Sequence, residues 1–395
     1  MARALAVLWC ACLAAQGAEV VATLTMSARG AAVADIVVDG RVAAQQVVWA
    51  GADRYPYRVF LGPAAGKVHA ALNAKHSAAG ALIEVHDVRL ERSEDPCHAN
   101  APVLFARPNT AGRHSDYPTL AYCTESAGAL EFTVIFSNED GGTSTRALMA
   151  RWGRTTDIEY VYRIGKDGRG IIQAKGHNDV AFAGARDGAH PLLIVSTDNN
   201  MVAPAEGTPE PRFHVAPMRV DLQEHSREIV MDQHPATYRV MAEELEREGK
   251  LRPFGAVDGQ KISDPRNYLF IEAKIANRDS RLAARVKLRG EDRWRASHLG
   301  RADYAIERDG WVRTTVELPP GTAPSQIARI GFECLIEPPG RDRPAPVAGE
   351  CRLEAVSKVF LLDRAYRPGQ SIWSSAPGAR IPTGEMVVFA IPHGN

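Results

Sequence analysis

The 395-residue chain is predicted to be mainly β, with several antiparallel β-sandwiches around a β-rich central domain that carries one notable helix. Short runs in which apolar and polar residues alternate recur along nearly the whole chain, as in strands with one buried face. The 33 glycines and 25 prolines are spread between these runs, as many short turns require. This length allows two or three domains.

The charge composition and the missing motifs exclude several classes of function. Lysine plus arginine equals aspartate plus glutamate at 47 each, so no strong field attracts nucleic acid or an anionic membrane. The sequence contains no phosphate-binding P-loop, no G-x-G-x-x-G after a strand and no H-E-x-x-H. It also contains no G-x-S-x-G. Nucleotide-dependent chemistry, the common zinc proteases and nucleophile-elbow hydrolases are therefore disfavoured.

The N-terminus is predicted to be a signal peptide at 1–18. Arg3 supplies the charge and 4–15 an apolar run, after which small residues suit cleavage. An uncleaved anchor is the alternative, but this run is shorter than a membrane span. No later run reaches the length of a span, so we expect a secreted or periplasmic protein without one.

Four cysteines remain after removal of this segment. An even number in an oxidising compartment favours disulfides, and nearest-neighbour pairing predicts Cys97–Cys123 and Cys334–Cys351. A loop of about 20 residues closed in this way would contribute roughly 3 kcal/mol. A zinc site is the alternative, but it is disfavoured because no C-x-x-C spacing exists.

Turn-rich boundaries divide the rest of the chain into five parts. We predict an N-terminal β-sandwich at 19–93, a central β-rich domain at 94–250, a linker at 251–265, a C-terminal β-sandwich at 266–366 and a tail at 367–395.

One segment, 236–249, has a clear helical period. It places four apolar residues on one face, namely Tyr238, Met241, Ala242 and Leu245. Gly249 is expected to end the helix, and Asp232 could cap its beginning.

The C-terminal sandwich carries a resemblance to known modules. Gly310–Pro319, followed by Ile327–Phe332, resembles the jelly-roll modules attached to secreted carbohydrate-active enzymes. The resemblance covers 266–366 and implies a jelly-roll-like sandwich that binds sugar or calcium, or that supports a neighbouring domain. The central block resembles no family in this way.

The densest polar stretch runs from 137 to 164. At its start, Asn138, Glu139 and Asp140 precede a pair of glycines. Three oxygen-bearing side chains beside a flexible turn suit calcium or another divalent metal, although the same residue types also make ordinary turns. Glu139 or Asp140 could instead be a catalytic carboxylate at the end of a strand.

Further along this stretch, Arg151, Trp152 and Arg154 precede Asp157 and Glu159. On a strand, the two carboxylates share one face. Paired carboxylates with arginines and a stacking tryptophan suit sugar chemistry, so we predict substrate contacts by the first three residues and catalysis by the last two. The alternative is an exposed strand face with ion pairs of little energy. The expected faces group Val161 with the carboxylates, opposite Ile158, Tyr160 and Tyr162.

Two histidines are further candidates for acid/base chemistry. His114 and Asp116 are two residues apart, and so are His177 and Asp179. If the two pairs met in space, they would form a ligand set for zinc or manganese. Each pair could equally be a hydrogen-bonded loop. Histidine titrates near working pH, which makes His114 and His177 candidate bases.

Together these patterns favour a secreted protein that binds or modifies a glycan in its central domain, by hydrolysis or lysis if it is an enzyme. On a uronate polymer, arginines would hold the carboxylates and a histidine or tyrosine could abstract a proton. The alternative is a non-catalytic extracellular binding or structural protein with calcium-stabilised loops. The two differ in geometry, because an enzyme requires the polar clusters to converge in one cleft.

Overall fold

The computed structural model describes most of the chain, namely 18–49, 51–63, 66–107, 116–139, 141–256, 260–340, 344 and 346–392, without the side chains of 51 and 52. Three features predicted from the sequence fall outside these residues. They are the signal peptide, up to residue 17, and the candidate residues His114 and Asp140.

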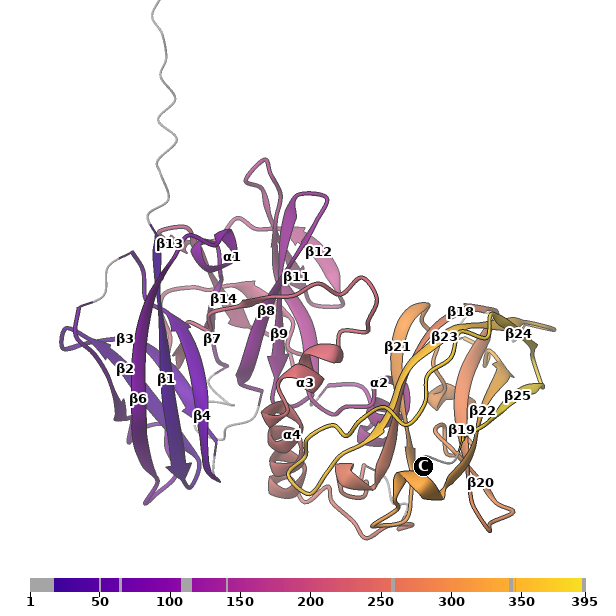
Figure 1. Ribbon diagram of the computed structural model, residues 1–395. Coiled ribbons are helices and arrows are strands. Elements are labelled where there is room, and N and C mark those ends of the chain that lie inside the picture. Colours follow the sequence, from indigo (N-terminus) through magenta and orange to yellow (C-terminus); the bar gives the residue numbers. More distant parts are fainter. Residues whose placement is uncertain are drawn as a thin grey trace, which may run out of the picture.

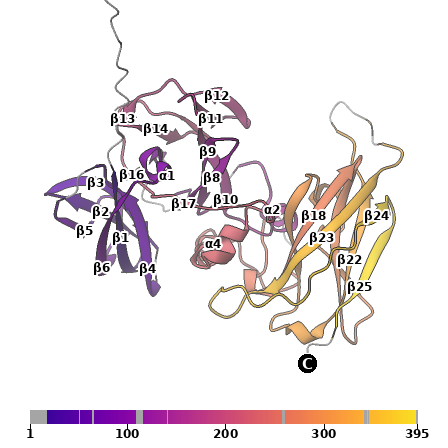
Figure 2. The same ribbon diagram turned by 45° about the horizontal axis from the view of Figure 1, so that its top comes forward.

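Three β-rich parts follow one another along the chain, from indigo through magenta to yellow in Figure 1. Nearly all strand pairs are antiparallel, and helices are few and short. The predicted class of a mainly β, multi-domain protein is therefore confirmed. Figure 2 shows helices α2 and α4 between the central part and the C-terminal sandwich.

The N-terminal part consists of two three-stranded sheets. Their orders are β4–β1–β6 and β3–β2–β5. The strands are β1 (Glu19–Arg29), β2 (Ala32–Val38), β3 (Arg41–Val48), β4 (Gly51–Phe60), β5 (Val68–Leu72) and β6 (Leu82–Ser93). Asp39 and Gly40 join β2 to β3 with positive φ angles of 49° and 80°, as a tight hairpin turn requires.

The central part contains two more sheets. A six-stranded sheet has the order β12–β11–β10–β9–β8–β17, and a smaller sheet has the order β13–β14–β7–β16, with β15 paired to β14. Their bounds are β7 (Val103–Phe105), β8 (Pro118–Ser126), β9 (Ala129–Phe136), β10 (Asp157–Ile164), β11 (Gly170–Ala174), β12 (Asn178–Ala181), β13 (Arg186–Asp187), β14 (His190–Val195), β15 (Val202–Pro204), β16 (Arg212–Phe213) and β17 (Met218–Arg219).

A β-bulge changes which side chains of β10 share a face. The register with β9 shifts between Tyr160 and Tyr162, so Val161 is the extra residue. Asp157 and Glu159 share a face, as predicted from the two-residue period. Beyond the bulge, however, Tyr162 packs in the same core as Val161, so the expected grouping with Ile158 is wrong there.

Four helices accompany the sheets: α1 (Pro96–Ala99), α2 (Thr145–Trp152), α3 (Ile229–Gln233) and α4 (Ala236–Arg247). As predicted, α4 is the longest among the described residues. Gly249 ends it in a left-handed conformation, and the amide of Lys250 donates to the carbonyl of Leu245. The prediction that Asp232 caps α4 is wrong, because Pro235 is the N-cap and no side chain caps it.

The C-terminal part is an antiparallel sandwich of two four-stranded sheets, with orders β21–β18–β23–β24 and β20–β19–β22–β25. The elements are β18 (Tyr268–Arg278), β19 (Ser280–Leu288), β20 (Trp294–Ala296), β21 (Gly310–Glu317), β22 (Ile327–Ile336), β23 (Glu350–Leu361), β24 (Ala379–Pro382), β25 (Met386–Ala390) and the short 3-10 helices η1 (Pro265–Asn267), η2 (Ala302–Tyr304) and η3 (Pro324–Gln326). The last two strands lie in the predicted tail, so the sandwich extends past residue 366.

The hydrophobic cores show how the parts are joined. The N-terminal sheets and the central sheets share one cluster, which contains Val21 and Phe132. The C-terminal sandwich has its own core. A third cluster fills the space between the central sheet, α3, α4 and the C-terminal sandwich, where Phe270 of β18 stacks on Phe360 at 5.0 Å. The parts therefore pack directly against one another and are not joined by linkers alone.

Both predicted disulfides are present. Cys97–Cys123 joins α1 to β8 with a Cα separation of 6.0 Å. Cys334–Cys351 joins β22 to β23, and so links the two sheets of the C-terminal sandwich, at 5.6 Å. In the part of the chain that the structure describes, no helix is long and apolar enough to cross a membrane.

Candidate functional site

A pocket of about 700 Å³ lies where the central sheet meets the C-terminal sandwich. Six separate segments line it: the loop after β9, the end of α2 with the start of β10, the β11–β12 turn, the loop after β14, Arg227 before α3, and Arg308 of the C-terminal part. Two polar clusters that are far apart in the sequence therefore converge in one cavity, which is the geometry expected of an enzyme site.

A glycine allows two of these segments to approach each other. A Cβ on Gly141 would lie 2.9 Å from the backbone nitrogen of Asn199, closer than real Cβ contacts. The loop after β14 can therefore pack directly on the turn that follows β9. This close approach brings Asp198 and Asn199 to the edge of the pocket beside Glu139.

Three carboxyl groups form the floor of the pocket. Asp157 lies opposite Phe136, the last residue of β9, and Glu139 follows that strand three residues later. Glu159 lies on the same face of β10 as Asp157. The exposed fractions of Glu139, Asp157 and Glu159 are 7%, 1% and 8%. Groups that are this well buried lose most of their hydration, which disfavours their charged forms.

The carboxyl cluster therefore retains protons. Burial, and next the charge of Asp157, raise the pKa of Glu139 and of Glu159 to about 8. Burial also raises the pKa of Asp157, against the opposing effect of Arg154. The nearness of the Asp157 carboxyl group adds to the rise in the pKa of Glu159. Because the three groups interact, they titrate as a unit that is partly protonated at neutral pH.

Asp157 is the most firmly fixed of the three carboxyl groups. The amide of Asn200 donates to Asp157 Oδ2 at 3.0 Å and also to the carbonyl of Asn138 at 3.0 Å. Arg154 Nη1 lies 3.9 Å from Asp157 Oδ1. A hydrogen bond and an ion pair both favour the ionised form, so Asp157 is the best placed of the three groups to remain a carboxylate.

Arg154 also connects the cluster to Glu228, a carboxylate whose pKa is lowered and not raised. Its Nε lies 3.2 Å from Glu228 Oε1, and Arg308 Nη2 lies 3.6 Å from the same oxygen. Although burial acts to raise it, the charges of Arg308 and Arg154 are the main causes that lower the pKa of Glu228 to about 2. One end of the site thus holds an ionised carboxylate, and the other holds protonated ones.

Cationic and aromatic side chains complete the pocket wall. Arg227 and Lys175 line it, as does Trp152, whose ring lies 5.7 Å from the guanidinium of Arg154. His177, in the β11–β12 turn with φ 58°, places Nδ1 4.0 Å from Glu159 Oε2. Its Nε2 contacts the amide nitrogen of Asn199 at 3.2 Å. His177 is thus within reach of the carboxyl cluster, as its role as a candidate base requires.

Other predicted contacts do not reach the pocket. Arg151 donates to the carbonyl of Asp303, so it joins α2 to the C-terminal part and does not line the cavity. The amide of Asn138 donates to Glu248 at 2.6 Å, away from the carboxyl cluster. Among the described residues, no group of three or more His, Cys, Asp or Glu side chains is arranged to hold a metal ion.

The two His/Asp pairs do not form a common site in the described residues. Asp179 accepts a hydrogen bond from Tyr160 and pairs with Arg163 at 3.4 Å, outside the pocket. Asp116 pairs with Arg107 at 2.8 Å. His114 lies outside the described residues, so its predicted role remains a prediction.

Sequence reasoning missed four lining or supporting residues: Lys175, Arg227, Glu228 and Arg308. Arg308 belongs to a different domain, and only the packing of the C-terminal sandwich on the central sheet brings it to the pocket. Arg227 and Glu228 are adjacent charges in front of α3, a pattern that is common on protein surfaces. No local signal distinguishes them.

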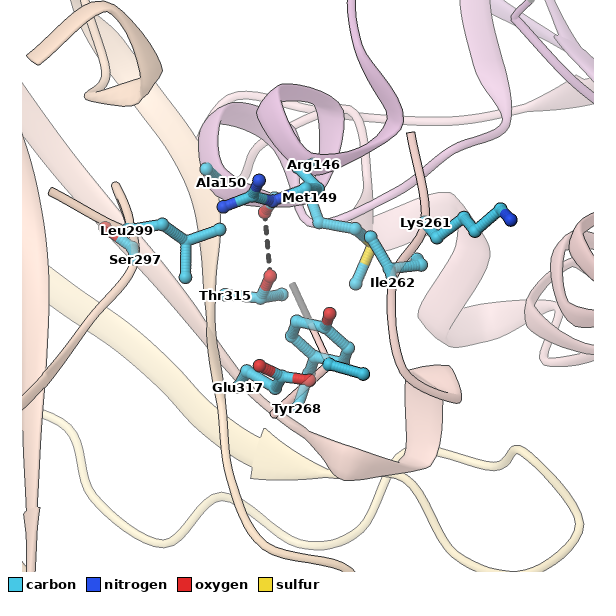
Figure 3. A pocket seen from close by; sticks show the side chains of 11 residues that line it. Arg146, Met149, Ala150, Lys261, Ile262, Tyr268, Ser297, Leu299, Thr315 and Glu317 are labelled. Carbon is cyan, nitrogen blue, oxygen red and sulfur yellow. Dashed lines mark hydrogen bonds between the residues drawn. The ribbon is translucent and has the colours of Figure 1, made fainter. Parts of the chain in front are cut away.

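Two other cavities lack such a cluster. Figure 3 shows a cavity of about 20 Å³ between α2 and the C-terminal sandwich, where the Thr315 hydroxyl donates to the Met149 carbonyl at 2.7 Å. It has room for about one water. A groove of about 1020 Å³ at the end of the C-terminal sandwich contains Asp264 and Asp363, each paired with a nearby arginine.

Comparisons with protein-family models, with curated proteins and with solved structures find no match for this chain. The inference of function therefore depends on the chemistry of the pocket between the central sheet and the C-terminal sandwich.

Proposed function

We propose that this is a secreted protein that binds a glycan in the pocket between the central sheet and the C-terminal sandwich, and that it cleaves the glycan there by acid/base chemistry. One observation carries the proposal. Three interacting carboxyl groups with raised pKa values converge with an aromatic ring and several cations in a cavity of about 700 Å³. That volume is within the usual range of small-molecule sites, roughly 300 to 1,000 Å³.

Cleavage of a glycosidic bond needs a proton donor and a carboxylate on either side of the bond. Glu139 and Glu159, with pKa values of about 8, are protonated at neutral pH and can donate. Asp157, held by Asn200 and Arg154, is the candidate carboxylate that acts as base or stabilises positive charge. A protonated carboxyl group next to one that is held by an arginine and an amide is an arrangement suited to acid/base catalysis.

Trp152 supports the choice of a sugar as ligand. It is the last residue of α2, it lines the pocket, and the guanidinium groups of Arg154 and Arg151 lie 5.7 and 6.0 Å from its ring. These contacts hold the indole in place. A fixed aromatic face above a set of hydrogen-bonding groups provides the apolar and polar surfaces that a sugar ring needs.

The test is an activity screen with isosteric variants. The purified protein is incubated with a panel of charged and neutral polysaccharides, and new reducing ends and unsaturated sugars are measured. Reducing ends alone indicate hydrolysis, and unsaturated ends indicate a lyase. Glu159→Gln and Glu139→Gln should each lower the rate by roughly 100-fold or more, because neither amide can donate the required proton. Glu224→Gln, at an exposed position outside the pocket, is the control.

Two outcomes decide against catalysis. Turnover that is equal in the wild type and both glutamine variants would show that the carboxyl cluster does not catalyse the reaction. Glycan binding without turnover would support the alternative of a non-catalytic binding protein that uses the same pocket.

A further inference from the structure

We infer that the glycan accepted by this pocket is negatively charged, and that Arg227 and Arg308 are the residues that select it. This inference rests on the proposed function and specifies its substrate class. The shared chemistry is an anionic oxygen group on the sugar, either the carboxylate of a uronic acid or a sulfate ester.

Four carboxyl groups and four cations line the pocket, but not every cation has a carboxylate partner among the described residues. Four cations line it: Lys175, Arg154, Arg227 and Arg308. Arg154 pairs with Asp157 and Glu228, and Arg308 pairs with Glu228. Asp198, at the rim, is paired with Arg107. In the part of the chain that the structure describes, the side chains of Lys175 and Arg227 have no ion-pair or hydrogen-bond partner.

Arg227 is the clearest sign of a missing anion. Its side chain is partly buried at the pocket wall and forms no hydrogen bond or ion pair with the described residues. Burial opposes its charge, but the nearby charges of Tyr122, Glu159 and Glu228 outweigh this effect and raise the pKa of Arg227. A partly desolvated arginine without a partner is costly, and it is favourable when a ligand supplies the opposite charge. Its planar fork of donors matches a carboxylate or sulfate in a bidentate arrangement.

Arg308 lines the same pocket as Arg227 and is held in position. Glu228, which is fully buried, contacts Arg308 at 3.6 Å and Arg154 at 3.2 Å through the same oxygen. Arg308 Nε is buried and has no hydrogen-bond partner within the protein. Glu228 thus orients Arg308 but does not accept hydrogen bonds from all of its N–H groups. A bound anion could therefore accept hydrogen bonds from Arg227 and Arg308 at once.

The carboxyl cluster does not oppose an anionic ligand. Burial and the charge of Asp157 raise the pKa of Glu139 and of Glu159 to about 8, so these groups are largely neutral at pH 7. A pocket with four cations and its nearest glutamates protonated has a positive potential. Such a potential favours charged over neutral sugars, more strongly at low ionic strength.

The experiment measures binding of three kinds of polysaccharide by calorimetry. Alginate, pectate and hyaluronan carry only carboxylates, dextran sulfate carries only sulfates, and dextran and laminarin are neutral. The wild type should bind at least one charged polymer roughly 10- to 100-fold more tightly than any neutral one, as charged hydrogen bonds imply. The class of charged polymer that binds, carboxylated or sulfated, identifies the anionic group that the pocket recognises.

Arginine variants assign the selectivity to the pocket. Arg227→Met and Arg308→Met should each lower the affinity for the charged polymer roughly tenfold or more and weaken its salt dependence. Arg169→Met, at an exposed turn outside the pocket, should change nothing. Arg227→Lys keeps the charge but loses the planar fork, so it gives an intermediate affinity and serves if the methionine variant does not fold.

The two proposals fail in different ways. If neutral polymers bind as tightly as charged ones and Arg227→Met has no effect, the charged substrate class is wrong while glycan binding stands. If no polymer of any kind binds, the proposed function fails and this inference fails with it.

Discussion

Replacement of Glu159 by glutamine should stabilise the protein at high pH and leave its stability at low pH nearly unchanged. In the folded protein, burial and the charge of Asp157 raise the pKa of Glu159 from the ordinary 4.5 to about 8. Between these values the folded state binds more protons than the unfolded state. The free energy of unfolding therefore falls as the pH rises through this window, and no such loss occurs below pH 4.5.

The size of the effect follows from the pKa difference. Each pKa unit corresponds to about 1.4 kcal/mol, so full ionisation of Glu159 would lower the free energy of unfolding by at most about 5 kcal/mol. Asp157 and Glu139 share the repulsion, so one substitution recovers only part of it. We expect Glu159→Gln to raise the free energy of unfolding by about 2 to 3 kcal/mol at pH 9 and by less than about 1 kcal/mol at pH 5.

The assay is urea unfolding at pH values from 5 to 9, followed by tryptophan fluorescence. Trp152 lies in the pocket wall and reports on this region. Glu224→Gln, an exposed glutamate, is the matched control and should follow the wild type at every pH. A Glu159→Gln variant that is destabilised equally at pH 5 and pH 9 would refute the reasoning, since it would mean that Glu159 is an ionised, well-compensated group.

Three further predictions concern stability. Arg154→Met should lower the free energy of unfolding by about 3 to 5 kcal/mol, because buried Asp157 loses its ion pair and buried Glu228 loses the nearer of its two arginines. Urea unfolding at pH 7 measures this, and a loss below about 1 kcal/mol would contradict it. Arg313→Met should destabilise the protein by a similar amount. Arg313 is fully buried and pairs with Asp232 of α3 at 2.7 Å and with Glu272 of the C-terminal sandwich at 2.8 Å, so its loss leaves two buried carboxylates without this partner. An unchanged melting temperature would contradict this prediction. Thiol titration of the denatured, unreduced mature protein, which lacks the predicted signal peptide at 1–18, should find no free thiol, while two or more would exclude the paired disulfides.

Much of the fold could be predicted from the sequence because it depends on local patterns. Alternating runs predicted most strands, the period of 236–249 predicted α4, and the spacing of four cysteines predicted both disulfides. The shared core of the N-terminal and central parts, and the strands in 367–395, depend on packing between distant segments. The bulge at Val161 is likewise set by the register with β9, which the sequence of β10 alone does not reveal.

The candidate site could be predicted in part. The two-residue period of a strand correctly placed Asp157 and Glu159 on one face, and both line the pocket with Trp152. Arg154, predicted to contact the substrate, also lines the pocket, but it is only 2% exposed and pairs with buried Glu228, a partner that its own sequence neighbourhood does not indicate. The contribution of Arg308 could not be predicted, because tertiary packing alone brings it to the pocket.

The pocket's role as a glycan site is tested most directly by a crystal structure of the protein with an oligosaccharide of the polymer that it binds best. The account predicts a sugar ring against Trp152, with its anionic group between Arg227 and Arg308 and a glycosidic oxygen within hydrogen-bond distance of Glu139 or Glu159. A sugar bound only in the groove of about 1020 Å³ at the end of the C-terminal sandwich, with the pocket empty, would contradict the account.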